Sequence, residues 1–241
     1  MSGQGHSHAA FRTTRWSVVV RARGNAPDSR QALDELCAAC WFPIYAFARR
    51  SGHAPSDAQD LVQGFFVEIV DKDLFDRVDA EKGRLRTFLL TAFKRHMQHA
   101  VRRETALKRG GTAESLSIDA LDAENWYAAE LVDGETAEHM YDRQWALGLL
   151  ESVAQDLALD WKQRGKEPMF TALRPYLTRD IDGDDYVVLE QKLGMTRTAL
   201  KSAVHRLRGQ YREQLISRVR QTQLDGEDHE SELQTLLEAL S

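Results

Sequence analysis

Two stretches of the chain concentrate basic side chains at helical spacing, and the chemistry they offer is the binding of phosphate. Residues 84–109 contain eight Lys or Arg and one acid, and residues 192–220 contain eight against one. Cationic helix faces attract the phosphate backbone of nucleic acid. The alternative for either stretch is an ordinary solvated helix face. Because two such stretches occur in one chain, the pattern favours a nucleic-acid-binding protein.

The other reactive residue types form no recognisable catalytic or metal centre. Cys37 and Cys40 have the spacing of half a zinc site or a redox pair. No second pair exists, and both fall on the apolar face of a predicted helix, which favours core packing. The acidic run 180–185 lacks the Gly and Glu positions of a calcium loop. No phosphate loop or nucleophile elbow occurs. We therefore expect no enzymatic activity, no cofactor and no metal.

The composition fits one or two folded domains. The 241 residues are 42% hydrophobic and carry a net charge of −5. This net charge is small because the two basic stretches are offset by residues 112–160, which contain twelve acids and a single Arg. No apolar run is long enough for a membrane helix, and residues 1–10 lack the features of a signal peptide. We expect a cytoplasmic protein that has no membrane partner.

Hydrophobic periodicity predicts an all-α fold. Apolar residues recur at steps of three and four over 33–48, 61–69, 85–101 and 145–161, which places them on single helix faces. Phe88 and Phe93 share this spacing, which favours a place in the core over a role in stacking on bases. No segment shows a strand with a partner.

Residues 186–219 have the pattern of a helix-turn-helix. A short amphipathic helix is predicted to end at Gly194, which provides a left-handed turn, and Thr196 can cap the next helix. That next helix has an apolar stripe opposite a basic one, as needed to dock a helix in the major groove. A plain helical hairpin with a solvated basic face is the alternative.

Three segments together resemble the sigma factors of bacterial RNA polymerase, and most closely the extracytoplasmic-function (ECF) subfamily. Residues 185–213 are similar to the second conserved domain of that family. Residues 56–66 resemble its helix that binds the polymerase clamp, and residues 86–103 resemble its promoter-melting helix. The resemblance covers roughly residues 14–220 and implies an all-helical initiation factor with two domains and no catalytic residues.

The resemblance also implies a domain order. We expect an N-terminal domain at 12–110 that binds core RNA polymerase and the −10 promoter element. An acidic linker is expected at 111–138. A C-terminal helix-turn-helix domain that binds the −35 element is expected at 139–220, followed by an amphipathic tail at 221–241.

Three sets of site residues follow from the resemblance and from side-chain chemistry. The residues expected to bind the polymerase are Asp57, Asp60 and Gln63. A single-stranded promoter segment needs a cationic groove with flat side chains, and the −10 set is Lys94, Arg95, His96, Gln98, His99, Arg102 and Arg103. The −35 set comprises base-edge candidates and phosphate-binding arginines: Arg197, Thr198, Lys201, Ser202 and His205, then Arg206, Arg208 and Arg212.

The chain departs from the family pattern at four of these positions or their neighbours. Gln59 and Gly64 stand where the family usually carries acids, and Arg95 and His99 where it usually carries Asn and Asp. We expect these changes to alter the strength of polymerase binding and the −10 preference.

Three kinds of control are suggested by the sequence. Ser56 lies at the start of the acid-poor clamp helix, where a phosphoryl group would add negative charge, so a kinase is one candidate partner. An anti-sigma factor is another. The C-terminal tail is a third candidate, if it docks on a DNA-binding domain.

Two other functions stay open at the level of sequence. One is a stand-alone helix-turn-helix regulator with an unrelated N-terminal domain, and the other is a metal-dependent enzyme acting on nucleic acid. The motif at 57–66 together with the basic helix at 84–103 favours a sigma factor over the first. The lack of residues at metal-ligand spacing counts against the second.

Overall fold

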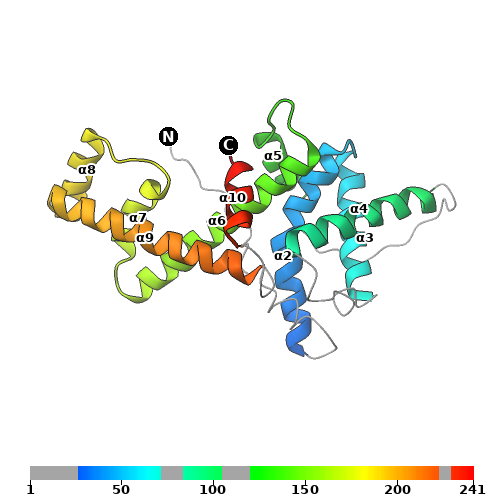
Figure 1. Ribbon diagram of the computed structural model, residues 1–241, viewed down its shortest axis with the longest axis horizontal. Helices are drawn as coiled ribbons and strands as arrows, with labels where there is room; N and C mark the ends of the chain where they lie inside the picture. The colour runs from blue at the N-terminus through cyan, green and yellow to red at the C-terminus, as the bar shows by residue number, and fades with distance from the viewer. Residues whose placement is uncertain (1–26, 72–83, 105–119, 223–228) are drawn as a thin grey trace. The chain divides into compact units, whose positions relative to one another are not determined.

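The computed structural model describes residues 27–71, 84–104, 120–222 and 229–241. All regular elements in these ranges are helices, which confirms the all-α fold class. They are α2 (Pro27–Arg50), α3 (Pro55–Asp71), α4 (Leu85–Glu104), α5 (Ala120–Ala129), α6 (Ala137–Gln163), α7 (Glu167–Leu173), the 3₁₀ helix η1 (Arg174–Leu177), α8 (Gly183–Leu193), α9 (Arg197–Gln221) and α10 (His229–Glu238) (Figure 1).

The described residues group into two compact units. Unit 1 contains the chain up to Gly148 together with Val219–Ser241, and unit 2 contains Leu149–Arg218. The boundary at Gly148 lies inside α6, later than the expected domain start at residue 139. The first turns of α6 belong to unit 1 because Tyr141 is fully buried there: its hydroxyl donates to the carbonyl of Arg86 at 3.0 Å, and its ring meets Phe47 edge-on.

The core of unit 1 is built where α3 packs against α2 and α4 (Figure 1). The ring centroids of Phe65 and Phe93 lie 5.2 Å apart in an edge-on arrangement, and Phe47 adds a second edge-on contact to Phe93 at 6.2 Å. Cys37 and Cys40 are both buried, which confirms that they pack in the core. Burial raises the pKa of the Cys40 thiol, so a reactive thiolate is disfavoured.

Part of the expected linker is a docked helix of unit 1. Glu124 on α5 accepts hydrogen bonds from the Arg49 guanidinium at 2.6 and 2.8 Å and from the Tyr45 hydroxyl at 2.7 Å. Trp126 meets Phe42 edge-on, and Tyr127 is buried. The acidic composition that suggested a linker therefore includes an acid that α2 uses as a partner.

The C-terminal tail is also part of unit 1. Glu232 on α10 has a side chain only 2% exposed; it accepts hydrogen bonds from Arg86 and forms an ion pair with Arg84 at 2.7 Å. Arg86 also pairs with Asp142 of α6. Leu236 is buried on the same helix. An ion-pair network thus joins the tail to the start of α4.

Unit 2 contains the later turns of α6 and the helices α7, η1, α8 and most of α9. The indole of Trp161 packs on Phe170 and donates to Gln210 of α9 at 3.2 Å. The helix α8 ends at Gly194, whose φ of +63° is left-handed, a conformation that Gly adopts at little cost. The hydroxyl of Thr196 then accepts from the backbone N–H of Ala199 at 3.4 Å, at the start of α9.

None of the helices in the described ranges is both long enough and apolar enough to traverse a bilayer.

The contact between Glu124 and Arg49 predicts a pH dependence of stability. Hydrogen bonds from Arg49 hold the pKa of Glu124 below its ordinary value. Such a carboxylate stabilises the fold above its unfolded pKa of about 4.3, and this contribution is lost as the pH falls through the lower, folded value. We expect the stability difference between the wild type and Glu124→Gln to shrink on acidification.

Urea unfolding at several pH values, from about 6 down to about 3, measures this difference. The matched control is Asp122→Asn, which removes an exposed carboxylate from the same helix. A Glu124→Gln effect that is constant across the range would contradict the expectation.

The buried carboxylate of Glu232 predicts a large effect from a single change in the tail. Removing one partner of a buried ion pair typically costs about 3–5 kcal/mol. Because Arg86 keeps Asp142, we expect Glu232→Ala to lower the free energy of unfolding by about 3 kcal/mol. The control is Glu238→Ala, an exposed acid of the same helix. Equal and small shifts in the urea midpoint for the two variants would show that α10 adds little to unit 1.

Candidate nucleic-acid interface

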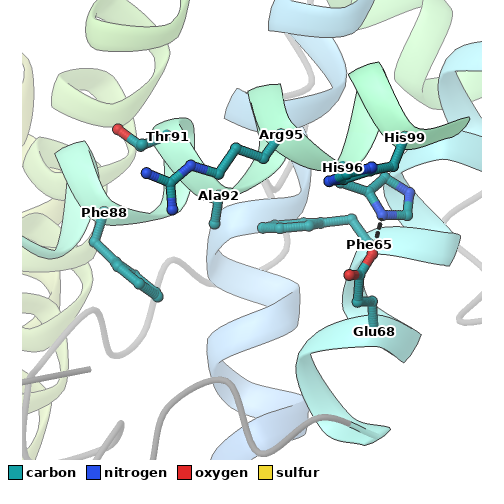
Figure 2. A pocket seen from close by; sticks show the side chains of 8 residues that line it. All are labelled: Phe65, Glu68, Phe88, Thr91, Ala92, Arg95, His96 and His99. Atoms are coloured by element: carbon teal, nitrogen blue, oxygen red, sulfur yellow. Dashed lines mark hydrogen bonds and ion pairs between the residues drawn. The ribbon is translucent and has the colours of Figure 1, made fainter. Parts of the chain in front are cut away.

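A pocket of about 350 Å³ lies between α3 and α4. Figure 2 shows the side chains around it, two from α3 and six from α4: Phe65, Glu68, Phe88, Thr91, Ala92, Arg95, His96 and His99. Aromatic faces and N–H donors meet in one concave site. This is a combination that can stack on a nucleobase and hydrogen-bond its edge.

The wall of this pocket is held in place by His96. Its Nδ1 lies 2.5 Å from a carboxylate oxygen of Glu68, the contact marked by the dashed line in Figure 2. The imidazole stacks on Phe93 at 6.4 Å and lies 5.8 Å from the ring of Phe65. With its side chain only 10% exposed, His96 supports the pocket from within and is poorly placed to bind a phosphate.

The two positions of α3 that depart from the expected acids differ in their surroundings. A Cβ atom at Gly64 would lie 3.4 Å from Nε2 of His96, which is an ordinary van der Waals contact, so a longer side chain at this position would meet the imidazole. Gln59 is half-buried, and its amide nitrogen is buried without a hydrogen-bond partner.

The expected polymerase-binding residues lie on α3. Asp57 and Asp60 are exposed, and Gln63 is half-buried. Ser56 is exposed and lies next to the first of these acids. Its hydroxyl donates to the Asp57 carboxylate at 3.4 Å.

The expected −10 residues other than His96 divide into three groups. Lys94 is engaged inside unit 1: its ammonium lies 2.7 Å from Glu138 and 5.4 Å from the centroid of the Phe47 ring. Arg95, Gln98 and His99 are exposed. The side chains of two residues in the last turn of α4 lie outside the described part of the structure: Arg102 and Arg103.

The two aromatic residues of α4 have different environments. Phe93 is fully buried, as its spacing predicts. Phe88 is half-buried and lines the pocket. Glu68 was not predicted as a site residue, because its contact with His96 joins two helices and leaves no local signal in the sequence.

The expected −35 residues lie on α9 in unit 2. Most are exposed: Arg197, Thr198, Lys201, Ser202, His205, Arg206 and Arg212. Arg208 differs from these, because its guanidinium donates to the carbonyls of Tyr176 and Arg179 and pairs with Asp180 at 3.1 Å. Its charge already serves to join α9 to the end of η1.

Within the described ranges, no three His, Cys, Asp or Glu side chains are grouped so that they could hold a metal ion.

These features describe an all-helical protein with exposed basic residues on one helix of each unit. Residues 43–106 match the family model described as Sigma-70 region 2. The matched range includes α3 and α4, and so the pocket and the acids of α3. The match supports a sigma factor with a role in promoter recognition and transcription initiation, and it implies interaction with core RNA polymerase and promoter DNA. The searches of curated proteins and of solved structures gave no match.

Arg95 is exposed, whereas the neighbouring Lys94 pairs with Glu138. We therefore expect alanine substitutions at the two positions to affect DNA binding differently. Removing one phosphate-binding cation reduces the slope of log Kd against log salt by about one. We expect Arg95→Ala to weaken binding of single-stranded DNA and reduce this slope. We expect Lys94→Ala to lower thermal stability and to leave the slope unchanged, because Lys94 pairs with Glu138.

Fluorescence anisotropy with a labelled oligonucleotide of mixed sequence measures the slope, and circular dichroism measures Tm. A larger loss of DNA binding from Lys94→Ala than from Arg95→Ala would overturn this assignment.

Proposed function

We propose that this chain is a sigma factor of the ECF type, which binds core RNA polymerase and directs promoter-specific initiation. The observation that carries the proposal is that the Sigma-70 region 2 match includes the pocket between α3 and α4, which is lined by Phe88 and by exposed Arg95 and His99. Nucleotide addition would belong to the polymerase. Such a factor would act in the cytoplasm, where its polymerase works.

The proposed contact with core polymerase is the exposed face of α3. Asp57 and Asp60 project from its first turns and are exposed, so a basic surface on the polymerase could reach them. Gln63 extends the same face by about one turn. Gln59 and Gly64 add no carboxylate to this face, so the proposed acidic surface at the start of α3 is small.

The proposed contact with the −10 element is the α4 pocket. A base taken out of the stack could lie on Phe88 and receive hydrogen bonds on its edge from Arg95, while His99 lines the pocket about three turns further along α4. Gln98 lies on the same helix and is exposed. Arg95 has no acceptor where Asn would offer an amide oxygen, and His99 replaces a carboxylate with an imidazole, so we expect a base preference different from that of typical relatives.

The proposed contact with the −35 element is the exposed face of α9, docked in the major groove. Its inner face is held by buried Leu200, Ala203 and Leu207. The early turns then present Arg197 and Lys201 to base edges, and Arg206 and Arg212 follow at positions suited to phosphates.

Regulation by a partner is part of the proposal. A kinase that modifies exposed Ser56 would add negative charge next to Asp57, and an anti-sigma factor could cover the same face of α3.

The proposal is tested first by binding to core RNA polymerase. We expect Asp57→Ala/Asp60→Ala to keep its helical content and to lose affinity for core polymerase at least tenfold, as expected from the loss of about 1.4 kcal/mol or more. Co-sedimentation or surface plasmon resonance with purified core measures the affinity.

The control is Asp122→Ala/Asp133→Ala, which removes two exposed acids from another part of unit 1. Transcription from a DNA fragment that lies upstream of this protein's own gene then tests initiation by the same purified mixture of protein and core polymerase. A wild-type chain that binds the DNA but neither binds core polymerase nor supports initiation would favour the stand-alone regulator.

A further inference from the structure

Two cations at the start of α9 share one aromatic ring. The guanidinium carbon of Arg197 lies 4.5 Å from the centroid of the Tyr186 ring, and the ammonium of Lys201 lies 6.0 Å from it. Tyr186 comes from α8 and is half-buried, whereas Arg197 and Lys201 are exposed. The contact therefore joins the two helices of the hairpin on their solvent side.

The ring offsets a repulsion that the sequence of α9 creates. Arg197 and Lys201 are four residues apart on one helix, where like charges repel. The face of an aromatic ring attracts cations within about 6 Å of its centroid. By attracting both, Tyr186 restricts two long side chains that would otherwise sample many rotamers. Fewer rotamers are then lost when these side chains bind a ligand.

The ring is itself positioned by the loop before α8. The Asp182 side chain accepts from the backbone N–H of Asp185 at 2.8 Å, and the Asp185 carboxylate accepts from the Tyr176 hydroxyl at 2.7 Å and pairs with Arg179. These contacts hold the first turn of α8, in which the N–H of Tyr186 bonds to the carbonyl of Asp182 at 3.3 Å. The backbone position of Tyr186 is thus fixed by the first turn of α8 and its cap.

The ring contact distinguishes two of the basic residues of α9 from the rest. Among the described residues, Arg197 and Lys201 are the cations of α9 that lie over an aromatic face. Arg208 is bonded to backbone carbonyls of its own unit. The pair on Tyr186 lies in the early turns of the helix, which contact base edges in helix-turn-helix proteins.

We propose, on the basis of the −35 recognition proposed above, that Tyr186 is a positioning residue for base readout by Arg197 and Lys201. A planar guanidinium can stack on a ring while its edge N–H groups stay free. Those N–H groups match the O6 and N7 acceptors of guanine in the major groove. The ligand class that this arrangement fits best is a guanine-containing duplex site.

The test is a double-mutant cycle in which the preference of each variant for one base over the others is measured. The full-length wild type, Tyr186→Phe, Tyr186→Leu, Arg197→Ala and Tyr186→Leu/Arg197→Ala are each bound to a library of double-stranded DNA, and the bound fraction is sequenced. We expect a guanine preference in the wild type that Tyr186→Phe retains, because Phe keeps the ring face.

We expect Tyr186→Leu to reduce the discrimination for guanine by about two- to fivefold, the range that an exposed cation–π contact supports. In the Arg197→Ala background the same change should cost less discrimination, because only Lys201 is then left for the ring to position. Circular dichroism checks that each variant keeps its helical content, and Tyr186→Met replaces Tyr186→Leu if that variant unfolds.

Two outcomes overturn the proposal, and they differ. A guanine preference that Tyr186→Leu leaves intact, with affinity lowered equally for all sequences in both backgrounds, would show that the ring only packs. A wild-type chain with no base preference at any position would overturn the −35 recognition itself, and the positioning role with it.

Discussion

A buried guanidinium, that of Arg86, joins three helices of unit 1. Its partners are Asp142 on α6 and Glu232 on α10, and its own backbone carbonyl accepts from Tyr141. Burial by itself lowers the pKa of Arg86, but the hydrogen bonds and charges of the two acids raise it above its ordinary value. A charge removed from water needs such partners, because an unpaired buried charge costs several kcal/mol. The start of α4, the first turns of α6 and the C-terminal helix are therefore interdependent.

This constraint divides the basic residues of α4 by the direction in which they point. The residues with acidic partners in unit 1 are Arg86, which pairs with Glu232 together with Arg84 just before the helix, and Lys94, which pairs with Glu138. The residues on the outer face, Arg95 and His99, line the pocket and are exposed. A helix that is basic on several sides thus uses some of its charge to hold the fold and leaves the rest available to a ligand.

Unit 2 follows the same rule with different partners. Arg208 and Arg218 are engaged inside the unit, the first with carbonyls near η1 and the second with Asp156 of α6. Arg197 and Lys201 lie over the ring of Tyr186, a contact that leaves both charges exposed. In unit 2, the two cations proposed to read base edges are thus held over a ring, a contact that does not neutralise them with an acid.

Features that depend on neighbours a few residues away were predictable from the sequence. Helix periodicity repeats every three to four residues, so the all-α class, the buried Phe93 and the end of α8 at Gly194 all have local signals. The motif at residues 56–66 is likewise local and lies within the range matched to Sigma-70 region 2.

The division of the charges between fold and surface had no such signal. Lys94 and Glu138, or Arg86 and Glu232, are far apart in the chain, and whether they meet depends on how whole helices pack. The docking of α5 and α10 and the cation–ring contact across the turn after Gly194 arise in the same way. An ion pair acts over a few ångströms in space at any separation along the chain, so composition and periodicity could locate the basic helices but could not say which of their charges would be left for DNA.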